Sequence, residues 1–314
     1  MRKLFLFPFF EYLAKLINIR IGNIKFLLQF RKRFHKTKIL KTNAKSIDEI
    51  VIKSNVLKNL LYDIGLNEKT NLVLHSSMSG IKFDKSDENF VNELINLFPQ
   101  GSLSIPTIPL LRRDKINNSF LFDISRSKST TGRLSNVLLK LPNSCRSSFP
   151  LNNITSIGSN ANHIIGDEST FFQQKSACDR HSPWYRLYEL DAVMLFINVF
   201  PAHAMTMIHV AEESFNEVFP IPDSIWYNNI NFTIVKKDGS SVIRILQERY
   251  HHWSIHYAET KLNHDLLKLG ILKRYTINDV ELYFCHSKEL VSFLLSKRPS
   301  VYPYFFTKIK FSHV

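Results

Sequence analysis

The chain has 314 residues, of which 44% are hydrophobic and 22% are charged. This balance excludes disordered, collagen-like and fibrous repeat proteins, and it predicts one or two globular domains with a sizeable core. The formal net charge of +14 would by itself suggest a nucleic acid or an anionic membrane as partner.

Most of that charge lies at the N-terminus. Residues 1–46 hold twelve Lys or Arg residues and one acidic residue, Glu11, so +11 of the +14 lies there and the other 268 residues carry +3. We therefore expect a basic arm, residues 1–45, followed by a nearly neutral domain, residues 46–314. Nucleic acid is not an expected partner of that domain.

Within the arm, apolar residues recur at helical spacing from Leu13 to Phe30, and the basic run Arg31–Arg33 follows them. The pattern predicts a basic amphipathic helix. Peripheral contact with an anionic membrane is one interpretation. Packing on the protein's own core or on a second copy is the other main one, which leaves a homo-oligomer open, and RNA or another polyanion is the third.

No export signal is expected, because the opening apolar run is short, contains Pro8 and has no cleavage site after it. No stretch reaches the roughly 18–20 apolar residues that span a bilayer. The cysteines, Cys145, Cys178 and Cys285, are odd in number and lack CxxC spacing, which favours a reducing compartment. We expect a cytoplasmic protein, with the inner face of the membrane as an alternative site reached through the arm.

Helical and strand patterns alternate from Ser46 onward. They predict an α/β fold, a mixed sheet flanked by helices with an antiparallel C-terminal part. A capping box, Ser46 to Glu49, predicts a helix to about Tyr62. The other expected elements are strands at 71–75, 102–107 and 191–199, helices at 88–97, 132–139 and from about Met205, and a hairpin of 226–235 with 241–246 around Asp238–Gly239.

The usual phosphate loops, the GxSxG elbow and the HExxH motif are absent from the sequence, so we expect no metal. His209 and Glu212 are three residues apart in a segment that we expect to be helical. There the carboxylate would share a face with the imidazole and orient it. Such a histidine is suited to act as a general base.

Five segments match one family in order. They are Leu74–Gly80, like its VHSSL loop; Ile105–Thr107, like its MPT strand end; Thr131–Leu134 with Pro142 and Arg146–Ser147, like MGxL...P...RS; Ser182–Leu187, like SPxxxL; and Thr206–Glu212, like TxLHxAE. From about Ser46 to Glu213 the chain thus resembles the aminoglycoside 3-N-acetyltransferases, the antibiotic N-acetyltransferase family.

The resemblance implies acetyl transfer from acetyl-CoA, as cosubstrate, to a small-molecule amine. His209 would be the general base and Glu212 would fix its tautomer. Thr206 would bond the acceptor or the thioester oxygen. The family's loop and strand end would place four residues along CoA, namely His75, Ser76, Ser77 and Thr107.

The chain also departs from the family pattern. Phe149 stands where the family commonly has histidine, and Asn136 stands where it often has glutamate. Loss of a histidine and an acid near the cleft would weaken binding of a polycationic aminoglycoside. For this reason, and because the arm is compatible with a membrane, we expect an amino sugar of a surface glycan or a nucleotide sugar as acceptor, with an aminoglycoside antibiotic as the alternative.

The alternative to an enzyme is a catalytically inactive binding or scaffold protein that keeps the fold. Several other residues have both a cleft interpretation and a packing one: Phe149, Trp184 and Tyr185 as a stacking platform, His251, His252 and His256 as an acceptor pocket, and Asp179, Arg180 and His181 at the cleft edge.

Overall fold

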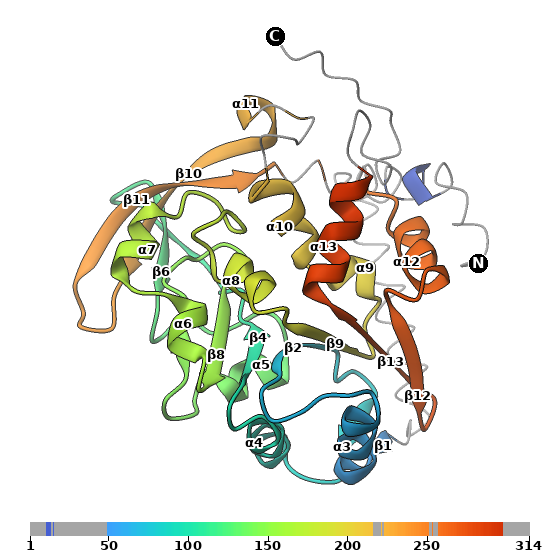
Figure 1. Cartoon of the computed structure of the whole chain (residues 1–314). Helices are drawn as coiled ribbons and strands as arrows, with labels where there is room; N and C mark the ends of the chain where they lie inside the picture. The colour runs from blue at the N-terminus through green and yellow to red at the C-terminus, as the bar shows by residue number, and fades with distance from the viewer. Residues whose placement is uncertain are drawn as a thin grey trace, which may run out of the picture.

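The computed structural model describes residues 11–13, 15, 49–215, 221, 223–250, 253 and 257–297. Figure 1 shows a mixed sheet with helices on both faces. The sheet has seven strands in the order β12-β13-β9-β2-β4-β8-β7. Their bounds are β2 Asn71–Ser76, β4 Ser102–Pro106, β7 Cys145–Arg146, β8 Ile154–Gly158, β9 Val193–Ile197, β12 Lys273–Ile277 and β13 Val280–His286.

The centre of this sheet is parallel and the flanks are antiparallel. β2 pairs in parallel with β4 on one side and with β9 on the other. Side chains of β2 alternate between two cores, with Leu72 and Leu74 in one and Val73 in the other. Both faces of the central strands are therefore covered, which is what a near-continuous apolar run in a parallel strand requires.

Helices cover each of the two cores. α3 (Ser54–Asp63), α4 (Asp87–Leu97) and α5 (Arg133–Leu138) contribute to one core. α8 (Pro183–Glu189), α10 (Met207–Glu213), α12 (Glu259–Lys268) and α13 (Ser287–Ser296) contribute to the other. The shorter helices are α6 (Ala161–Ile165), α7 (Glu168–Gln173), α9 (Pro201–Ala204) and α11 (Asp223–Trp226).

A second sheet of four strands has the order β11-β10-β6-β5. Its strands are β5 (Arg112–Asp114), β6 (Ser119–Asp123), β10 (Tyr227–Val235) and β11 (Ser241–Arg249). The predicted hairpin is confirmed, and Gly239 has the positive φ of +85° that such a turn needs. β11 runs three residues beyond its predicted end and carries Arg249 opposite Tyr227.

The mixed sheet and the elements from residue 71 to 213 are confirmed, whereas the predicted helix from Ser46 is wrong in its start. Residues 46–48 lie outside the described residues, and β1 (Ile50–Ile52) pairs with β3 (Ile81–Phe83). α3 begins only at Ser54, whose N–H and hydroxyl both donate to Asp84 Oδ1, at 2.9 and 2.6 Å. The helix thus starts where a carboxylate from a distant loop satisfies it.

Of the arm, the structure describes residues 11–13 and 15, which are helical and contact α12. This contact agrees with the packing interpretation for that turn, and a membrane contact of the remaining arm stays a prediction. Within the described part of the chain, no helix combines the length and the apolar character that crossing a bilayer requires.

Candidate active site

A cavity of about 430 Å³ lies at the carboxyl ends of the central parallel strands. Ser76 ends β2, Pro106 ends β4 and Val199 follows β9, and all three line the cavity. β2 is the strand at which the chain changes direction across the sheet, since β4 lies on one side of it and β9 on the other. Open α/β sheets commonly bind ligands at such a point.

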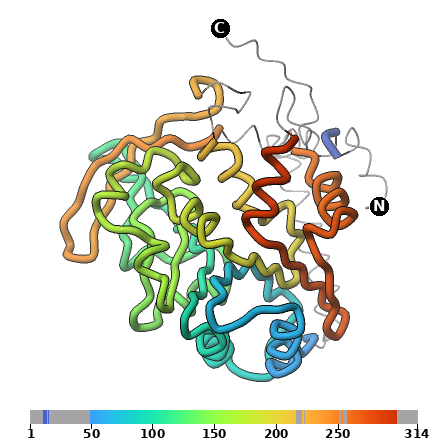
Figure 2. The backbone as a smooth tube through the Cα atoms, viewed as in Figure 1, coloured from blue at the N-terminus to red at the C-terminus, as the bar shows by residue number. Residues whose placement is uncertain are grey.

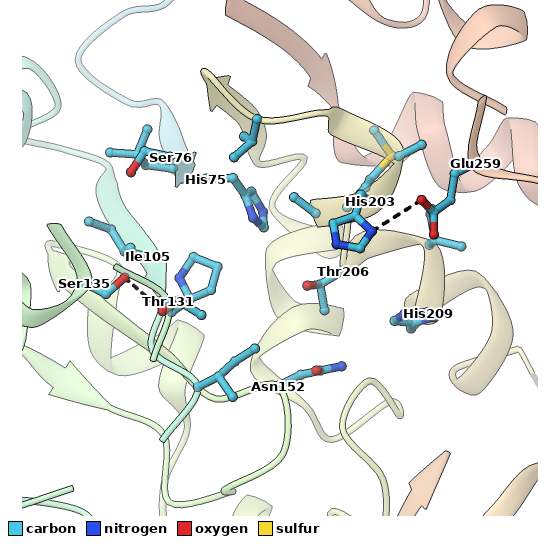
Figure 3. Close-up of a pocket in the computed structure, with 18 of the residues that line it drawn as sticks. His75, Ser76, Ile105, Thr131, Ser135, Asn152, His203, Thr206, His209 and Glu259 are labelled. Carbon is cyan, nitrogen blue, oxygen red and sulfur yellow. Dashed lines mark hydrogen bonds and ion pairs between the residues drawn. The ribbon is translucent and has the colours of Figure 1, made fainter. Parts of the chain in front are cut away.

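Two different walls face each other across the cavity. Figure 3 shows Ser76, Thr131 and Ser135 on one side, and His203, His209 and Glu259 on the other. The first wall offers hydroxyl groups beside apolar side chains. The second wall offers titratable groups, whose side chains could exchange protons with a bound molecule.

His209 and Glu212 form the pair that the sequence predicts. α10 buries Met207, Ile208, Val210 and Ala211 in the core, which leaves His209 half-buried at the cavity. His209 Nδ1 lies 2.6 Å from Glu212 Oε2. The second carboxylate oxygen, Oε1, accepts a 2.6 Å hydrogen bond from the Tyr257 hydroxyl. Because Glu212 is ionised and accepts at Nδ1, we assign the proton of the neutral imidazole to Nδ1, and Nε2 carries the lone pair.

Arg249 adds a positive charge beside this pair. Its Nη1 lies 2.5 Å from His209 Nδ1, 2.7 Å from His209 Nε2, 3.3 Å from the Tyr257 hydroxyl and 3.7 Å from Glu212 Oε2. Burial and then the charge of Arg249 lower the pKa of His209, against the opposing effect of Glu212. Burial opposes ionisation of Glu212, yet His209, Arg249 and Tyr257 hold the pKa of its carboxyl below the usual value. The imidazole is therefore a neutral acceptor at neutral pH.

Thr206 is the N-cap residue of α10 and lines the cavity one turn before His209. It is half-buried, and its hydroxyl makes no capping bond to the helix. The predicted trio of Thr206, His209 and Glu212 is thus brought together on one short helix, with the first two at the cavity and the third behind them.

His75 lines the cavity at the end of β2, with 7% of its surface exposed. Its ring stacks on Phe196, with 4.9 Å between centroids, and lies 6.1 Å from the ring of Trp184. Burial lowers the pKa of His75 to about 3, so it is neutral. Its Nε2 is buried without a hydrogen-bond partner among the described residues.

Ser76 lines the cavity, but Ser77 and Thr107 are not among the lining residues. The Ser77 N–H donates to the Ile197 carbonyl at 3.0 Å. Thr107 is fully buried, and its hydroxyl bonds Asn153 and Thr155, at 2.8 Å each. The CoA contacts that the family resemblance implies for Ser77 and Thr107 stay predictions.

The two departures from the family pattern, Phe149 and Asn136, are not among the residues that line this cavity. Phe149 is buried in the core, and Asn136 holds the preceding loop through bonds to Ser129 and Gly132. The expectation that they weaken aminoglycoside binding assumed that they lie at the cleft. Their positions remove that argument.

The other residues that have both a cleft and a packing interpretation take packing or loop roles where the structure describes them. Trp184 is buried and donates from Nε1 to the Asn152 carbonyl at 2.7 Å. Tyr185 packs against Tyr188 and Phe215. Asp179 accepts backbone N–H bonds from Lys175, Ser176 and His181, and Arg180 donates to the Ser214 carbonyl. His251, His252 and His256 lie outside the described residues.

Among the titratable residues of the cavity wall, the sequence does not predict His203, Arg249, Tyr257 and Glu259 as site residues. None belongs to a family motif, and Arg249 and Tyr257 reach the pair from 40 and 45 residues further along the chain. Within the part of the chain that the structure describes, there is no group of three or more metal-ligating side chains.

The model of the aminoglycoside 3-N-acetyltransferase family matches residues 73–297. A solved structure of apo aminoglycoside acetyltransferase AAC(3)-IVa is similar, with 22% identity, a TM-score of 0.62, and coverage of 79% of this chain and 89% of that chain. A binary complex of AAC-IIIb with CoASH has 17% identity, a TM-score of 0.65, and coverage of 78% and 96%. Sisomicin-bound AAC-VIa has 16% identity, a TM-score of 0.64, and coverage of 79% and 99%.

These structural similarities, at such low identity, establish a common fold. A search of curated protein sequences gives no match. The family match covers well over half of the chain and includes the His209–Glu212 pair, Arg249, Tyr257 and most of the cavity wall. The chain belongs to the aminoglycoside 3-N-acetyltransferase family.

Proposed function

We propose that the protein transfers the acetyl group of acetyl-CoA to an amino group of an aminoglycoside. The observation that carries this proposal is the neutral His209 at the cavity, held by the buried carboxylate of Glu212. An amine attacks a thioester only as the free base, and a base placed at the acceptor is what the reaction needs.

The acceptor amine would displace Arg249 Nη1, 2.7 Å away, from the lone pair of His209 Nε2. Nε2 would then take the amine proton while the amine nitrogen forms a bond to the acetyl carbonyl carbon. The carbon–sulfur bond breaks, and the sulfur leaves with the electron pair as the CoA thiolate, which is then protonated. Glu212 stabilises the imidazolium through Nδ1. Thr206, at the N-cap of α10, is placed to donate its hydroxyl to the acceptor or to the thioester oxygen.

The first wall of the cavity, which carries the hydroxyl groups, suits acetyl-CoA. Ser76, Thr131 and Ser135 supply hydrogen-bonding groups beside the apolar Ile105 and Pro106, a combination that fits an amide-containing, partly apolar pantetheine arm. Bound there, acetyl-CoA supplies an activated acyl group. The similar AAC-IIIb structure is a complex with CoASH, which supports this choice.

For the acceptor, the ligands bound in similar structures favour aminoglycosides over a glycan or a nucleotide sugar. AAC(3)-IVa variants are complexed with a gentamicin and with apramycin, and AAC-VIa with sisomicin. The preference for a glycan rested on a membrane-compatible arm and on Phe149 and Asn136, which are not among the residues that line the cavity. The second wall, with His203, His209 and Glu259, is where the acceptor would bind, and we call it the acceptor wall. Its acidic residue, Glu259, would pair with an ammonium of the antibiotic.

A panel assay tests this proposal. Thiol release from acetyl-CoA is measured with gentamicin, apramycin and sisomicin, and in parallel with glucosamine and an amino-sugar nucleotide. We expect turnover with at least one aminoglycoside at a higher kcat/KM than with either sugar. Preference for the nucleotide sugar would favour the glycan reading. Absence of both turnover and CoA binding would favour the inactive scaffold.

A further inference from the structure

The first described turn of the arm contacts the wall of the cavity. Figures 1 and 2 show this turn, in blue near the N-terminus, beside α12. The Glu11 carboxylate accepts the backbone N–H of Glu259 and of Thr260, at 3.1 Å each. Glu11 is buried, with 7% exposure. It thereby satisfies two of the N–H groups that a helix start leaves open, and it places a negative charge at the positive end of α12.

Lys15 extends this contact to the cavity. Its Nζ donates to the Tyr257 carbonyl at 2.7 Å and to Glu259 Oε1 at 3.0 Å, and it lies 3.3 Å from Glu11. Tyr257 and Glu259 both line the cavity, and the Tyr257 hydroxyl holds Glu212. The side chains of Lys15 and Glu259 are 22% and 21% exposed, so solvent screens this ion pair less than a pair on the open surface.

Both oxygens of Glu259 are engaged. Lys15 bonds Oε1, and His203 Nδ1 lies 3.3 Å from Oε2. Figure 3 shows His203 and Glu259 joined at the acceptor wall. An ammonium group arriving at this carboxylate has to compete with the ammonium of Lys15, because both make the same charge-assisted hydrogen bond.

We infer that Lys15 is a specificity-determining residue, which occupies the carboxylate of Glu259 and so limits the binding of acceptors with several ammonium groups. The inference rests on the proposed acetyl transfer to an amine. Lys15 precedes the region 73–297 that the family model matches. The arm therefore adds a cation from outside that region to the acceptor site.

The test uses Lys15→Met in the full-length chain, with gentamicin as the probe. We expect the KM for gentamicin to fall about tenfold, the scale of one charge-assisted hydrogen bond released for the acceptor, and the KM for acetyl-CoA to stay unchanged. In Lys15→Met/Glu259→Gln the gain should disappear, because the freed carboxylate is gone. A gentamicin KM that is unchanged or higher in Lys15→Met overturns the inference.

Lys261→Met is the matched control, since Lys261 pairs with Asp265 on the same helix α12 and does not line the cavity. It should leave both KM values unchanged. A fall in the gentamicin KM of the same size in Lys261→Met would show a general charge effect and would overturn the role of Lys15.

A second readout needs no turnover. The bond to Glu259 raises the pKa of His203, while burial and the charge of Lys15 lower it. The His203 titration followed by NMR should move to higher pH in Lys15→Met, and an unmoved titration contradicts the contact. If wild type acetylates no acceptor, the proposed function fails, and the NMR titration still decides whether Lys15 occupies Glu259.

Discussion

Replacing Glu212 by glutamine removes the charge that holds His209 and keeps the shape of the side chain. Glu212 is buried, with 1% exposure, and makes 2.6 Å bonds to His209 Nδ1 and to the Tyr257 hydroxyl. The amide oxygen can still accept from Nδ1, and the amide nitrogen can donate to Tyr257. Both bonds thus persist as neutral ones, about half as strong as charge-assisted bonds.

The neutral amide weakens the bonds to His209 and to Tyr257 from about 2–3 to about 1 kcal/mol each. The imidazolium thereby loses roughly 3 kcal/mol of stabilisation. We therefore expect kcat of Glu212→Gln to fall about 10²-fold, with an unchanged KM for acetyl-CoA. Thiol release at saturating substrate measures this effect.

The neighbouring Glu213 supplies the matched control. It is buried, and its Oε2 accepts the Cys178 N–H at 2.9 Å instead of contacting His209. Burial raises its pKa to about 7, so Glu213→Gln removes only about half a charge at neutral pH. Since Glu213 does not bond His209, kcat should stay close to wild type. The reasoning is refuted if Glu212→Gln keeps kcat within about threefold of wild type, since general acid–base catalysis contributes about 10²–10⁴-fold.

Three further substitutions test the site and the fold. Arg249→Met removes the charge that, after burial, lowers the pKa of His209; because only the neutral imidazole accepts a proton, the acidic limb of kcat/KM against pH should move to higher pH, and a move to lower pH would contradict the assignment. Tyr257→Phe deletes one bond to Glu212 and should lower kcat about tenfold, measured by thiol release, whereas an unchanged kcat would show that this bond does not support the base. A Cβ on Gly101 would lie 2.0 Å from the Thr70 carbonyl oxygen, so Gly101→Ala should lower the free energy of unfolding by about 1–3 kcal/mol in urea titration, and undiminished stability would contradict the packing there.

The sequence predicts best what depends on neighbouring residues. The alternation of Leu72, Val73 and Leu74 specifies a strand buried on both faces, and the His209–Glu212 spacing specifies a shared helix face. Each feature follows from the side-chain repeat of its own strand or helix. It can therefore be predicted without knowing which distant residues the element contacts. The Asp238–Gly239 hairpin is likewise a local signal.

What the sequence does not predict depends on long-range placement. Arg249 reaches His209 because β11 pairs with β10 in one particular register. No sequence motif indicates this contact. The capping box at Ser46 misleads because α3 starts instead at Ser54, where Asp84 supplies the acceptor. Phe149 and Asn136 mislead in another way, since their positions in the family motifs do not tell which side of the loop faces the cavity.

The most direct test of the central claim is single-turnover acetyl transfer by His209→Gln, with acetyl-CoA affinity measured by calorimetry on the same preparation. The His209 base predicts a transfer rate about 10²–10⁴-fold below wild type, with acetyl-CoA affinity unchanged because His209 lies on the acceptor wall opposite Ser76. A transfer rate equal to that of wild type, with intact acetyl-CoA binding, would contradict it.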